Sequence, residues 1–405
     1  MYDIFIIGAG ASGMAAAVAA AQNNPAVGIC IAEKNPQPGR KLAATGNGRC
    51  NITNTACPAS ASVREFLESI GIFTKEENEG RVYPYSEQAA QVVSAFAAQL
   101  SACGVDMLCG AGVTEVTRTQ CGTFLMKAGQ KQYEAKQLLI ACGGKAAPAF
   151  GTTGDGYAFA KQFGHQIQRL APVLTHLRSA DAAEAASLRG IRAKGKIALF
   201  RDDEKLAEET GEIQFTETGI SGIAVFNLSR YFRVGEGETP AEAFARFSVL
   251  IDFMPDHSPG MIVNLLAKKY GLPGMNRERL LETILDERLA RAVGERCAAQ
   301  HDVGAGSTAE DCIRTMAETV CAFSIKLAGA GGWKEAQCTA GGVNLDEIDL
   351  RTMESKSVRN LYFAGEIIDY DGPCGGYNLQ NAWETGIRAG VAMAERGKSC
   401  TEYTK

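Results

Sequence analysis

The sequence has few of the residue patterns that build metal centres or disulfide relays. Its 405 residues include only four histidines, and its thirteen cysteines form no CxxC, no zinc-ligand spacing and no CxxxxC pair. An odd number of irregularly spaced cysteines is not the framework of a secreted disulfide scaffold. We therefore expect a reduced, cytoplasmic chain that holds no metal and uses no disulfide relay.

The sequence also lacks an excess of charge of one sign. It has 41 Lys and Arg against 46 Asp and Glu, a formal net charge of −5, so no general positive field attracts nucleic acid or anionic lipid. Residues 4–21 carry no charge and approach the length of a membrane span. Glycine and alanine supply most of this run, and no basic segment precedes it. We expect neither nucleic acid nor a membrane as partner.

The length of the chain predicts two or three domains. With 46% hydrophobic and 21% charged residues, the chain has the composition of an ordinary globular protein with ample material for a core. We find no internal repeat and no low-complexity tract. The organisation of the chain must therefore be read from local patterns.

The N-terminal segment has the pattern of a dinucleotide-binding unit. A buried strand, a glycine turn and an alanine-rich helix are indicated by "DIFIIGAGASGMAAAVAAAQ", and a second strand by "AVGICIAEK". Gly8, Gly10 and Gly13 have the GxGxxG spacing: the first allows the tight turn, the second lets a pyrophosphate approach, and the third lets helix and strand pack closely. Amides at the helix start, from Ala11 and Ser12, then face the phosphates.

Glu33 ends the second predicted strand, twenty residues after Gly13. An acid in this place accepts hydrogen bonds from both ribose hydroxyls and repels a 2′-phosphate. A lone GxGxxG would be a weak signal, but here it lies between a strand and a helix and is followed by this acid. We therefore predict an ADP-containing cofactor, with Lys34 beside it.

A second cofactor pattern lies near the C-terminus, in "NLYFAGEIIDYDGPCGGYNLQNAWETGIRAGVAMAE", residues 360–395. It predicts a strand, a glycine–acid pair, a glycine-rich loop and a long helix, and it resembles the second flavin fingerprint of the large FAD-linked reductases and oxidases. In that superfamily the acid binds the ribityl chain or pyrophosphate, and the helix N-terminus faces the flavin edge where reduction places negative charge. The resemblance implies FAD, with contacts from Gly365, Glu366, Gly376, Asn378 and Leu379.

A third pattern, "QLLIACGGKAAPAFGTTGDGYAFAKQFGH", lies at residues 137–165. Its strand resembles the ATG segment that closes the dinucleotide domain, with Cys142 where Thr is common. By itself this segment is read equally well as a buried strand and turn, but three such patterns in this order favour FAD. We include Gly143 and Val113 in the predicted site.

The stretch "GRKLAATGNGRCNITN", residues 39–54, follows Glu33 closely and is expected to pass over the cofactor. Elsewhere it would be read as a solvated linker, but its glycines and donors favour a cofactor cradle. We expect Arg40 and Lys41 to reach phosphate. The remaining expected contacts, from backbone against the flavin to side chains near the ring, are Thr45, Gly46, Gly48, Arg49, Cys50 and Asn51.

Four segments together resemble one bacterial family. They are "GRKLAATGNGRCNITN", "GRVYPYSEQA", "GGKAAPAFGTTGDGY" and "AGEIIDYDGPCGGYNLQNAWETG". The family is that of the BaiN-like or aminoacetone-oxidase-like FAD-dependent flavoproteins, and the resemblance runs from about residue 3 to 395. It implies an α/β fold: a Rossmann-type FAD-binding domain like that of glutathione reductase, with an inserted β-barrel domain that carries a helical subdomain.

The sequence pattern agrees with such an insert. We expect residues 1–172 and 340–405 to form the FAD-binding domain and residues 173–339 the insert. Short alternating runs such as "IRAKGKIALF" predict the barrel over about 173–255 and 323–339, and apolar residues at three-and-four spacing predict helices over about 256–322. Acidic residues accompany the arginines of this helical block, which favours a solvated helix face over an RNA-binding patch.

The sequence indicates the reaction less directly than it indicates the cofactor. With no second GxGxxG and no disulfide pair, direct hydride exchange at flavin N5 remains, with NADH or NADPH as a transient donor. The leading hypothesis is reduction of an activated C=C bond of a small molecule, since BaiN-type members reduce bile-acid enones. The alternatives are an oxygen-dependent oxidase of small amines that releases hydrogen peroxide, and a flavin-binding protein that acts on RNA or another macromolecule.

Tyr377 is the proton-donor candidate, although packing under the flavin would explain it equally well. Cys50 and Cys374 either approach the flavin or serve as small packing residues. The weaker tyrosine candidates are Tyr83, Tyr85 and Tyr370. The histidines, which we interpret as structural, are His165, His176, His257 and His301.

Overall fold

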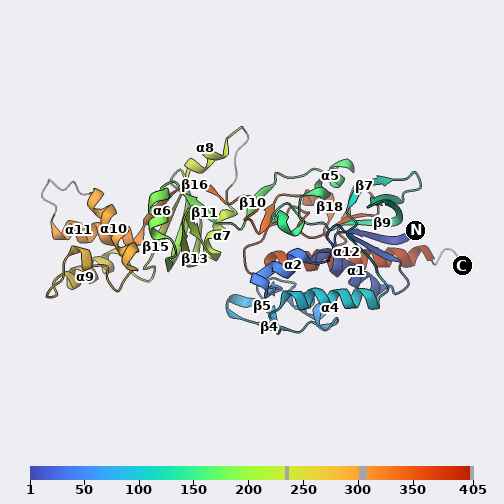
Figure 1. Ribbon diagram of the computed structural model, residues 1–405, viewed down its shortest axis with the longest axis horizontal. Helices are drawn as coiled ribbons and strands as arrows, with labels where there is room; N and C mark the ends of the chain where they lie inside the picture. The colour runs from blue at the N-terminus through green and yellow to red at the C-terminus, as the bar shows by residue number, and fades with distance from the viewer. Residues whose placement is uncertain (233–236, 301–307, 402–405) are drawn as a thin grey trace. The chain divides into compact units, whose positions relative to one another are not determined.

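The computed structural model describes residues 1–232, 237–300 and 308–401 (Figure 1). The chain divides into two compact units, one formed by Met1–Pro172 with Ala336–Lys405 and the other by Val173–Glu335. The two units have separate hydrophobic cores with no residue in common. The predicted fold class, a Rossmann-type domain with an inserted β-barrel that carries helices, is confirmed. The domain limits at 172/173 and 339/340 and those of the subdomain remain predictions.

The first unit is built on a sheet with the order β18-β19-β20-β9-β1-β2-β6. Its centre is parallel, because β1 pairs with β2 and β9, β2 with β6, and β9 with β20. The apolar run of β1 is buried from Ile4 to Ile7, as expected for a strand covered on both faces. The strands of this sheet are β1 (Tyr2–Ile7), β2 (Ile29–Glu33), β6 (Asp106–Cys109), β7 (Val113–Arg118), β8 (Phe124–Ala128), β9 (Lys131–Ile140), β18 (Ile348–Asp349), β19 (Glu354–Ser355) and β20 (Leu361–Phe363).

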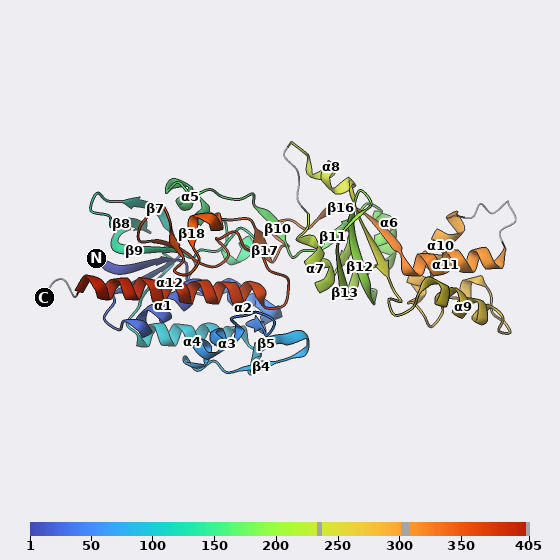
Figure 2. The same cartoon turned by 180° about the vertical axis from the view of Figure 1, so that it is seen from behind.

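Two helices from opposite ends of the chain, α1 (Ala11–Asn23) and α12 (Tyr377–Thr401), lie side by side (Figure 2). Two glycines of α12 allow this approach, because a Cβ at Gly386 would collide with the carbonyl of Ser12 and one at Gly390 with that of Ala16. The remaining elements of this unit are α2 (Arg40–Ala44), η1 (Thr45–Gly48), α3 (Ser60–Glu68), η2 (Asn78–Gly80), α4 (Ala89–Ala102), η3 (Pro148–Phe150), α5 (Asp155–Gln162), η5 (Leu345–Glu347) and the short strands β3 (Thr53–Asn54), β4 (Thr74–Glu76), β5 (Arg81–Pro84), β10 (Ala171–Val173) and β17 (Cys338–Ala340).

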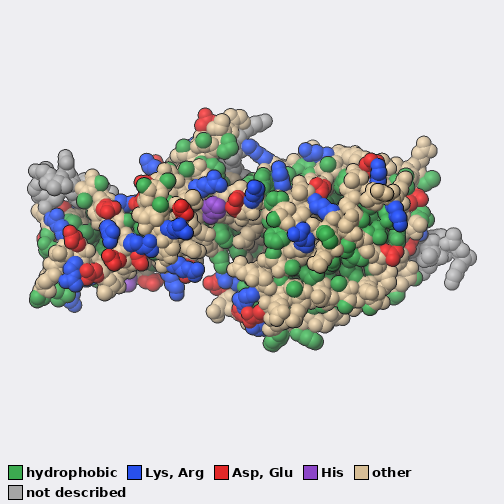
Figure 3. Space-filling model, in the orientation of Figure 1, with side chains coloured by type: hydrophobic (Ala, Val, Ile, Leu, Met, Phe, Trp, Pro, Cys, Tyr) green, Lys and Arg blue, Asp and Glu red, His purple; other side chains and the backbone are tan. Residues whose placement is uncertain are grey.

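The second unit contains a closed barrel with the strand order β11-β14-β13-β12-β15-β16. Burial alternates along β15 and β16, so every second side chain enters the barrel core. Acidic and basic side chains are interspersed on the face of this unit in Figure 3. The strands are β11 (Leu177–Ser179), β12 (Arg192–Arg201), β13 (Glu204–Thr216), β14 (Gly219–Ser221), β15 (Phe247–Asp252) and β16 (Phe323–Ala330).

The helices of the second unit extend the barrel core, because residues of these helices and of the barrel strands belong to one hydrophobic cluster. Thr308 begins the last of them with a reciprocal capping box to Asp311. Within the described ranges no helix is both long enough and apolar enough to cross a bilayer. The helices are α6 (Ala182–Leu188), α7 (Ile223–Ser229), α8 (Pro240–Ala245), α9 (Pro259–Tyr270), η4 (Arg277–Arg279), α10 (Glu287–Gln300) and α11 (Ala309–Cys321).

Candidate cofactor site

The three glycines between β1 and α1 have different surroundings. Gly8 has a φ of +105°, and a Cβ there would lie 2.7 Å from the carbonyl oxygen of Ala141. A Cβ at Gly13 would collide with the carbonyl oxygen of Gly8. At Gly10, by contrast, a Cβ would meet no protein atom within 4 Å. Packing therefore requires the first and third glycines, whereas the second borders the open space where a pyrophosphate is expected.

The start of α1 is free to bind an anion. Gly10 is its N-cap and provides no side-chain cap, and the first turn has no acidic residue. The hydroxyl of Ser12 donates to the carbonyl of Ala364 at 3.3 Å, and a Cβ at Gly365 would collide with this hydroxyl. The amides of the first turn, including those of Ala11 and Ser12, are left to an anionic ligand. This arrangement fits the diphosphate of FAD.

Glu33 is held at the end of β2 and is 8% exposed. One carboxylate oxygen accepts from the amide of Ala9 at 2.9 Å, and the other from the backbone and side-chain nitrogens of Asn35 at 2.8 and 2.7 Å. Because a carboxylate has about four acceptor sites and three are used here, about one remains for a ribose hydroxyl. The carboxylate thus fits the ribose-binding role predicted for it.

Lys34 and Arg40 have protein partners. The ammonium of Lys34 lies 2.6 Å from both the carboxylate of Asp155 and the hydroxyl of Thr153. Arg40 donates to the side-chain oxygen of Asn35 at 3.0 Å. Both side chains thus have partners in neighbouring loops, and the predicted contacts of Lys34 with the cofactor and of Arg40 with phosphate stay predictions.

Val113 begins β7, and the two residues before it lie at the end of β2. The amide of Ala111 donates to the carbonyl of Glu33 at 2.9 Å, and a Cβ at Gly112 would lie 3.1 Å from the Cβ of Lys34. Gly143, after β9, has a φ of +76° that favours glycine. The structure thus brings Ala111 and Gly112, which precede Val113, to the end of β2.

An ion pair between Lys41 and Glu366 joins distant parts of the chain. Their charged atoms are 2.6 Å apart, and both side chains are largely buried. The other oxygen of Glu366 accepts from the amide of Thr339 at 2.9 Å, and the hydroxyl of Thr339 accepts from the amides of Lys145 and Ala146. Burial is the largest single influence on the pKa of Lys41 and lowers it, but the charge and hydrogen bond of Glu366, together with the nearby Cys338, outweigh burial and raise the pKa. Lys41 therefore stays charged and offsets the charge of the Glu366 carboxylate.

The loop after α2 depends on left-handed backbone. Gly46, Asn47, Gly48 and Cys50 have φ values of 58°, 55°, 84° and 62°. A Cβ at Gly48 would meet no protein atom within 4 Å, and the hydroxyl of Thr45 is used locally, donating to the carbonyl of Leu42. Cys50 is fully buried, and burial raises its pKa to about 12, so its thiol stays protonated. The loop therefore leaves its backbone open at Gly48 and provides no thiolate at Cys50.

Arg49 belongs to a charged network at the edge of this loop. Its guanidinium lies 2.7 Å from Glu77 and 2.8 Å from Glu87, and 4.2 Å above the ring of Tyr83. Lys75 pairs with the same two acids. The side chain of Arg49 is thus held by protein partners, and we assign it to the shape of the loop.

The end of this loop is docked on the start of α12. The side chain of Asn54 donates to the carbonyl of Gly375 at 3.1 Å, and the hydroxyl of Thr53 donates to Gln380 at 2.6 Å. Trp383 donates to the carbonyl of Ile52 at 3.1 Å. Oriented to satisfy its neighbours, the amide of Asn51 accepts from the nitrogen of Gly376 at 3.1 Å. Sequence reasoning missed these contacts, for which the polar "NITN" was the only signal.

Tyr377, Asn378 and Leu379 begin α12. The side chain of Asn378 closes the preceding loop, accepting from the amide of Gly372 and donating to its carbonyl, each at 2.9 Å. Leu379 is partly buried against the core. Tyr377 follows the glycines directly and stays the proton-donor candidate, while Tyr370, 36% exposed, lies on the same loop.

The other tyrosine, histidine and cysteine candidates lie apart from one another. Tyr83 is buried, whereas Tyr85 is 68% exposed. His165 is buried between Glu347 and Ser355, with its ring nitrogens 2.8 and 2.9 Å from their oxygens, which is a structural role. Burial raises the pKa of Cys374. His176 and His257 lie in the second unit, and His301 is outside the described residues.

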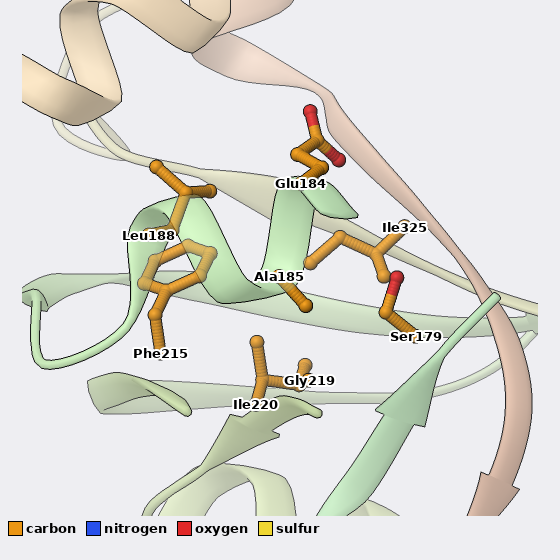
Figure 4. A pocket seen from close by; sticks show the side chains of 8 residues that line it. All are labelled: Ser179, Glu184, Ala185, Leu188, Phe215, Gly219, Ile220 and Ile325. Atoms are coloured by element: carbon orange, nitrogen blue, oxygen red, sulfur yellow. The ribbon is translucent and has the colours of Figure 1, made fainter. Parts of the chain in front are cut away.

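The second unit contains a small apolar pocket between α6 and the barrel (Figure 4). The carboxylate of Glu184 points away from its centre and accepts from the Nε of Arg296 at 2.7 Å. Because this pocket is small and lined mainly by apolar side chains, we interpret it as a packing gap and not a binding site. Its lining residues are Ser179, Glu184, Ala185, Leu188, Phe215, Gly219, Ile220 and Ile325.

Comparison with known proteins places the chain among others with this architecture. The model of the HI0933-like protein Rossmann domain family matches residues 2–64 and 59–392. A 3-dehydro-bile acid delta(4,6)-reductase of Clostridium scindens is 34% identical, over 98% of this chain and the whole of that protein. A ribosomal RNA dihydrouridine synthase of Haemophilus influenzae is 29% identical, over 96% of this chain and 98% of the other.

Among solved structures, similarity extends to a 3-ketosteroid-delta4-(5alpha)-dehydrogenase of Rhodococcus jostii in complex with 4-androstene-3,17-dione. The TM-score is 0.50 and the identity 13%, with 97% of this chain and 96% of the other covered. At this identity the comparison shows a shared fold and nothing more.

Proposed function

The chain belongs to the HI0933-like Rossmann-domain family, which confirms the predicted BaiN-like membership, and from this premise we propose that it is an FAD-dependent reductase of a C=C bond conjugated to a carbonyl group. Its broader class is that of the FAD-dependent oxidoreductases. One observation carries the proposed reaction: the 34% identity to a bile acid reductase along the whole of both chains. We propose an enone of the bile acid or steroid type as substrate, and NADH or NADPH as donor.

The residues of the first unit fit FAD. The open space at Gly10 and the uncapped start of α1 suit its diphosphate, and Glu33 suits the ribose of its adenosine. Lys41 keeps the site from accumulating negative charge where Glu366 approaches that diphosphate. When bound, FAD supplies hydride transfer at its N5 position. The protein's task is to bind and orient the cofactor, and to stabilise the negative charge that develops in the substrate.

The test is anaerobic mixing of the purified FAD-loaded protein with NADH and, separately, with NADPH. We expect one of them to bleach the flavin absorbance within minutes. Adding a 3-oxo bile acid with double bonds at positions 4 and 6 should then restore the absorbance and yield a reduced product. If neither nicotinamide bleaches the protein, the proposed donor is wrong; if the enone restores no colour, the proposed substrate is wrong.

A second candidate is reduction of uridine in RNA, favoured by the 29% identity to a ribosomal RNA dihydrouridine synthase along nearly the whole chain. The uracil double bond is also conjugated to a carbonyl, so the two candidates share one chemistry. The net charge of −5 and the mixed charges on the second unit do not favour RNA. Retention of ribosomal RNA in low salt, with dihydrouridine formed on incubation, would support this candidate over the enone.

A further inference from the structure

The pair of Lys41 and Glu366 lies at the edge of the first unit's sheet where ligands are expected. The strand register aligns Ile7 of β1 with Ile140 of β9 and Ile140 with Phe363 of β20, so these parallel strands end together. In open α/β sheets, ligands bind outside the carboxyl ends of such strands. Glu366 follows the last residue of β20 by three positions and pairs there with Lys41.

The residues just before Glu366 contact the first turn of α1. The hydroxyl of Ser12 donates to the carbonyl of Ala364 at 3.3 Å, and a Cβ at Gly365 would lie 2.4 Å from the same hydroxyl oxygen. The amides of this first turn are the predicted binding site of the FAD diphosphate. Glu366, one residue further along, thus brings a carboxylate to the neighbourhood of a ligand that is itself negative, and like charges repel unless a cation intervenes.

Two donors hold the Glu366 carboxylate. The ammonium of Lys41 lies 2.6 Å from one oxygen, and the amide of Thr339 donates to the other at 2.9 Å. Thr339 is itself fixed, because it is 0% exposed and its hydroxyl accepts from the amides of Lys145 and Ala146 at 2.8 and 2.9 Å. Each carboxylate oxygen therefore has one protein donor, and about two of its four acceptor sites remain for a ligand.

Close packing gives this carboxylate little freedom to turn. A Cβ at Gly144 would lie 2.4 Å from the hydroxyl of Thr339 and 2.8 Å from Oε1 of Glu366. The ammonium of Lys41 also lies 3.4 Å from the carbonyl of Ala146. Since the side chains of Lys41 and Glu366 are only 25% and 20% exposed, removing one partner leaves the other as a poorly solvated, uncompensated charge. The charge that is left has the opposite sign in the two cases.

We propose that Lys41 and Thr339 are positioning residues for FAD that act through Glu366. Thr339 fixes the direction of the carboxylate, and Lys41 cancels its charge beside the diphosphate. The inference deepens the proposed function and rests on its cofactor, not on its reaction. Without Lys41, the diphosphate meets the full charge of Glu366. Without the charge of Glu366, Lys41 is left to attract the diphosphate.

The first test measures FAD binding to the cofactor-free protein by calorimetry. We expect Lys41→Met to weaken FAD binding by at least about 100-fold, because it leaves an uncompensated carboxylate. Lys41→Arg keeps the cation and should retain most of the affinity. Glu366→Gln keeps the shape and an acceptor but not the charge, and should bind FAD at least as tightly as the wild type. A loss in Glu366→Gln as large as in Lys41→Met would show a purely structural pair and contradict the proposal.

A double variant decides whether Lys41 acts through Glu366 or binds the cofactor itself. Lys41→Met combined with Glu366→Gln has no unpaired charge, so its FAD affinity should return to within about tenfold of the wild type. If the double variant binds FAD as weakly as Lys41→Met, Lys41 contacts the diphosphate directly and the proposed role is wrong. The double variant also replaces Lys41→Met should that single variant fail to fold.

The second test identifies the part of FAD on which Lys41 acts. The probes are ADP, which has a diphosphate, and adenosine, which has none. Lys41→Met should weaken ADP binding, measured by calorimetry, by at least about 100-fold, as for FAD, and leave the weaker binding of adenosine, measured by NMR, unchanged. Equal losses for both probes would place the effect in the fold of the site and not in its charge.

The third test concerns Thr339. Thr339→Val removes the hydroxyl that accepts from two amides, and should weaken FAD binding by about tenfold, whereas Thr339→Ser should retain it. Because Thr339 acts through Glu366, Thr339→Val should have no further effect in a Glu366→Ala background. An equal loss in both backgrounds would rule out this route. Thr319→Val, the same change at a buried threonine of α11, is the matched control and should leave FAD affinity unchanged.

These outcomes differ from those that test the proposed function. If the wild-type protein binds no FAD, the cofactor is wrong and the roles of Lys41 and Thr339 fall with it. If the wild-type protein binds FAD but reduces no enone, the reductase is wrong while the binding results still decide the two roles.

Discussion

The glycines of the turn between β1 and α1 have different roles. Gly13 keeps α1 close to β1, because any side chain would collide with the Gly8 carbonyl. Gly10 has a φ of −82°, which alanine adopts readily, and faces no protein atom. The fold therefore does not need glycine at position 10. The need arises only when a ligand occupies the open space.

We expect Gly10→Ala and Gly13→Ala to separate binding from folding. Gly10→Ala should fold with unchanged thermal stability but lose FAD affinity by at least about 100-fold, because its Cβ enters the phosphate space. Gly13→Ala should lose about 1–3 kcal/mol of unfolding free energy through overpacking. Thermal denaturation of the cofactor-free proteins and the flavin content of the purified proteins measure the two effects. A Gly10→Ala protein that purifies fully yellow would contradict the pyrophosphate assignment.

At the scale of elements, the contact between α1 and α12 holds the two ends of the chain together. Gly386 and Gly390, one turn apart on α12, let the helix lie against the backbone of α1 at Ser12 and Ala16. The same contact brings Gly365 against the hydroxyl of Ser12. The stability of this helix pair and the shape of the cofactor site are therefore coupled.

Replacing Gly390 by alanine tests this coupling, with Gly294→Ala as the matched control in a helix. Gly294 lies in α10, where a Cβ would meet nothing within 4 Å. We expect Gly390→Ala to lower the unfolding free energy by about 1–3 kcal/mol and to reduce FAD retention, and Gly294→Ala to be neutral or stabilising by up to about 1 kcal/mol. Chemical denaturation measures both. Equal stability of the two variants would show that α12 tolerates a wider spacing from α1.

At the scale of the whole molecule, two separate cores predict two unfolding events. One core lies wholly in the unit with the glycine turn and the other wholly in the barrel unit. Every residue that we assign to FAD belongs to the first unit. A ligand stabilises the part that binds it and has no direct effect on a part that unfolds independently.

We expect calorimetry of the cofactor-free protein to resolve two transitions. FAD at about 100 times its Kd should stabilise the first unit by about 2.7 kcal/mol and raise one transition, while the other stays in place. Limited proteolysis before and after heating between the transitions identifies which unit has unfolded. A single transition that FAD shifts as a whole would show that the two units unfold as one cooperative body.

The sequence by itself determined the features that depend on short spacing. GxGxxG followed by Glu33 predicted the turn, the free start of α1 and the fixed acid, because neighbouring residues on a strand and a helix have few possible geometries. Alternating and three-and-four patterns likewise predicted the barrel and its helices, because burial follows these periods. Such rules act within one element and need no knowledge of the chain's path.

Only the tertiary structure decided how polar groups pair across the chain. Lys41 and Glu366 are 325 positions apart, and Asn54 and Gly375 are 321 apart, so no local pattern links them. Lys34 pairs with Asp155, 121 positions further along the chain, because a charged side chain binds a partner that the fold brings near. The hydroxyl of Thr175 has no hydrogen-bond partner among the residues that the structure describes, and no local sequence pattern could show this because it is a property of the surroundings and not of the residue.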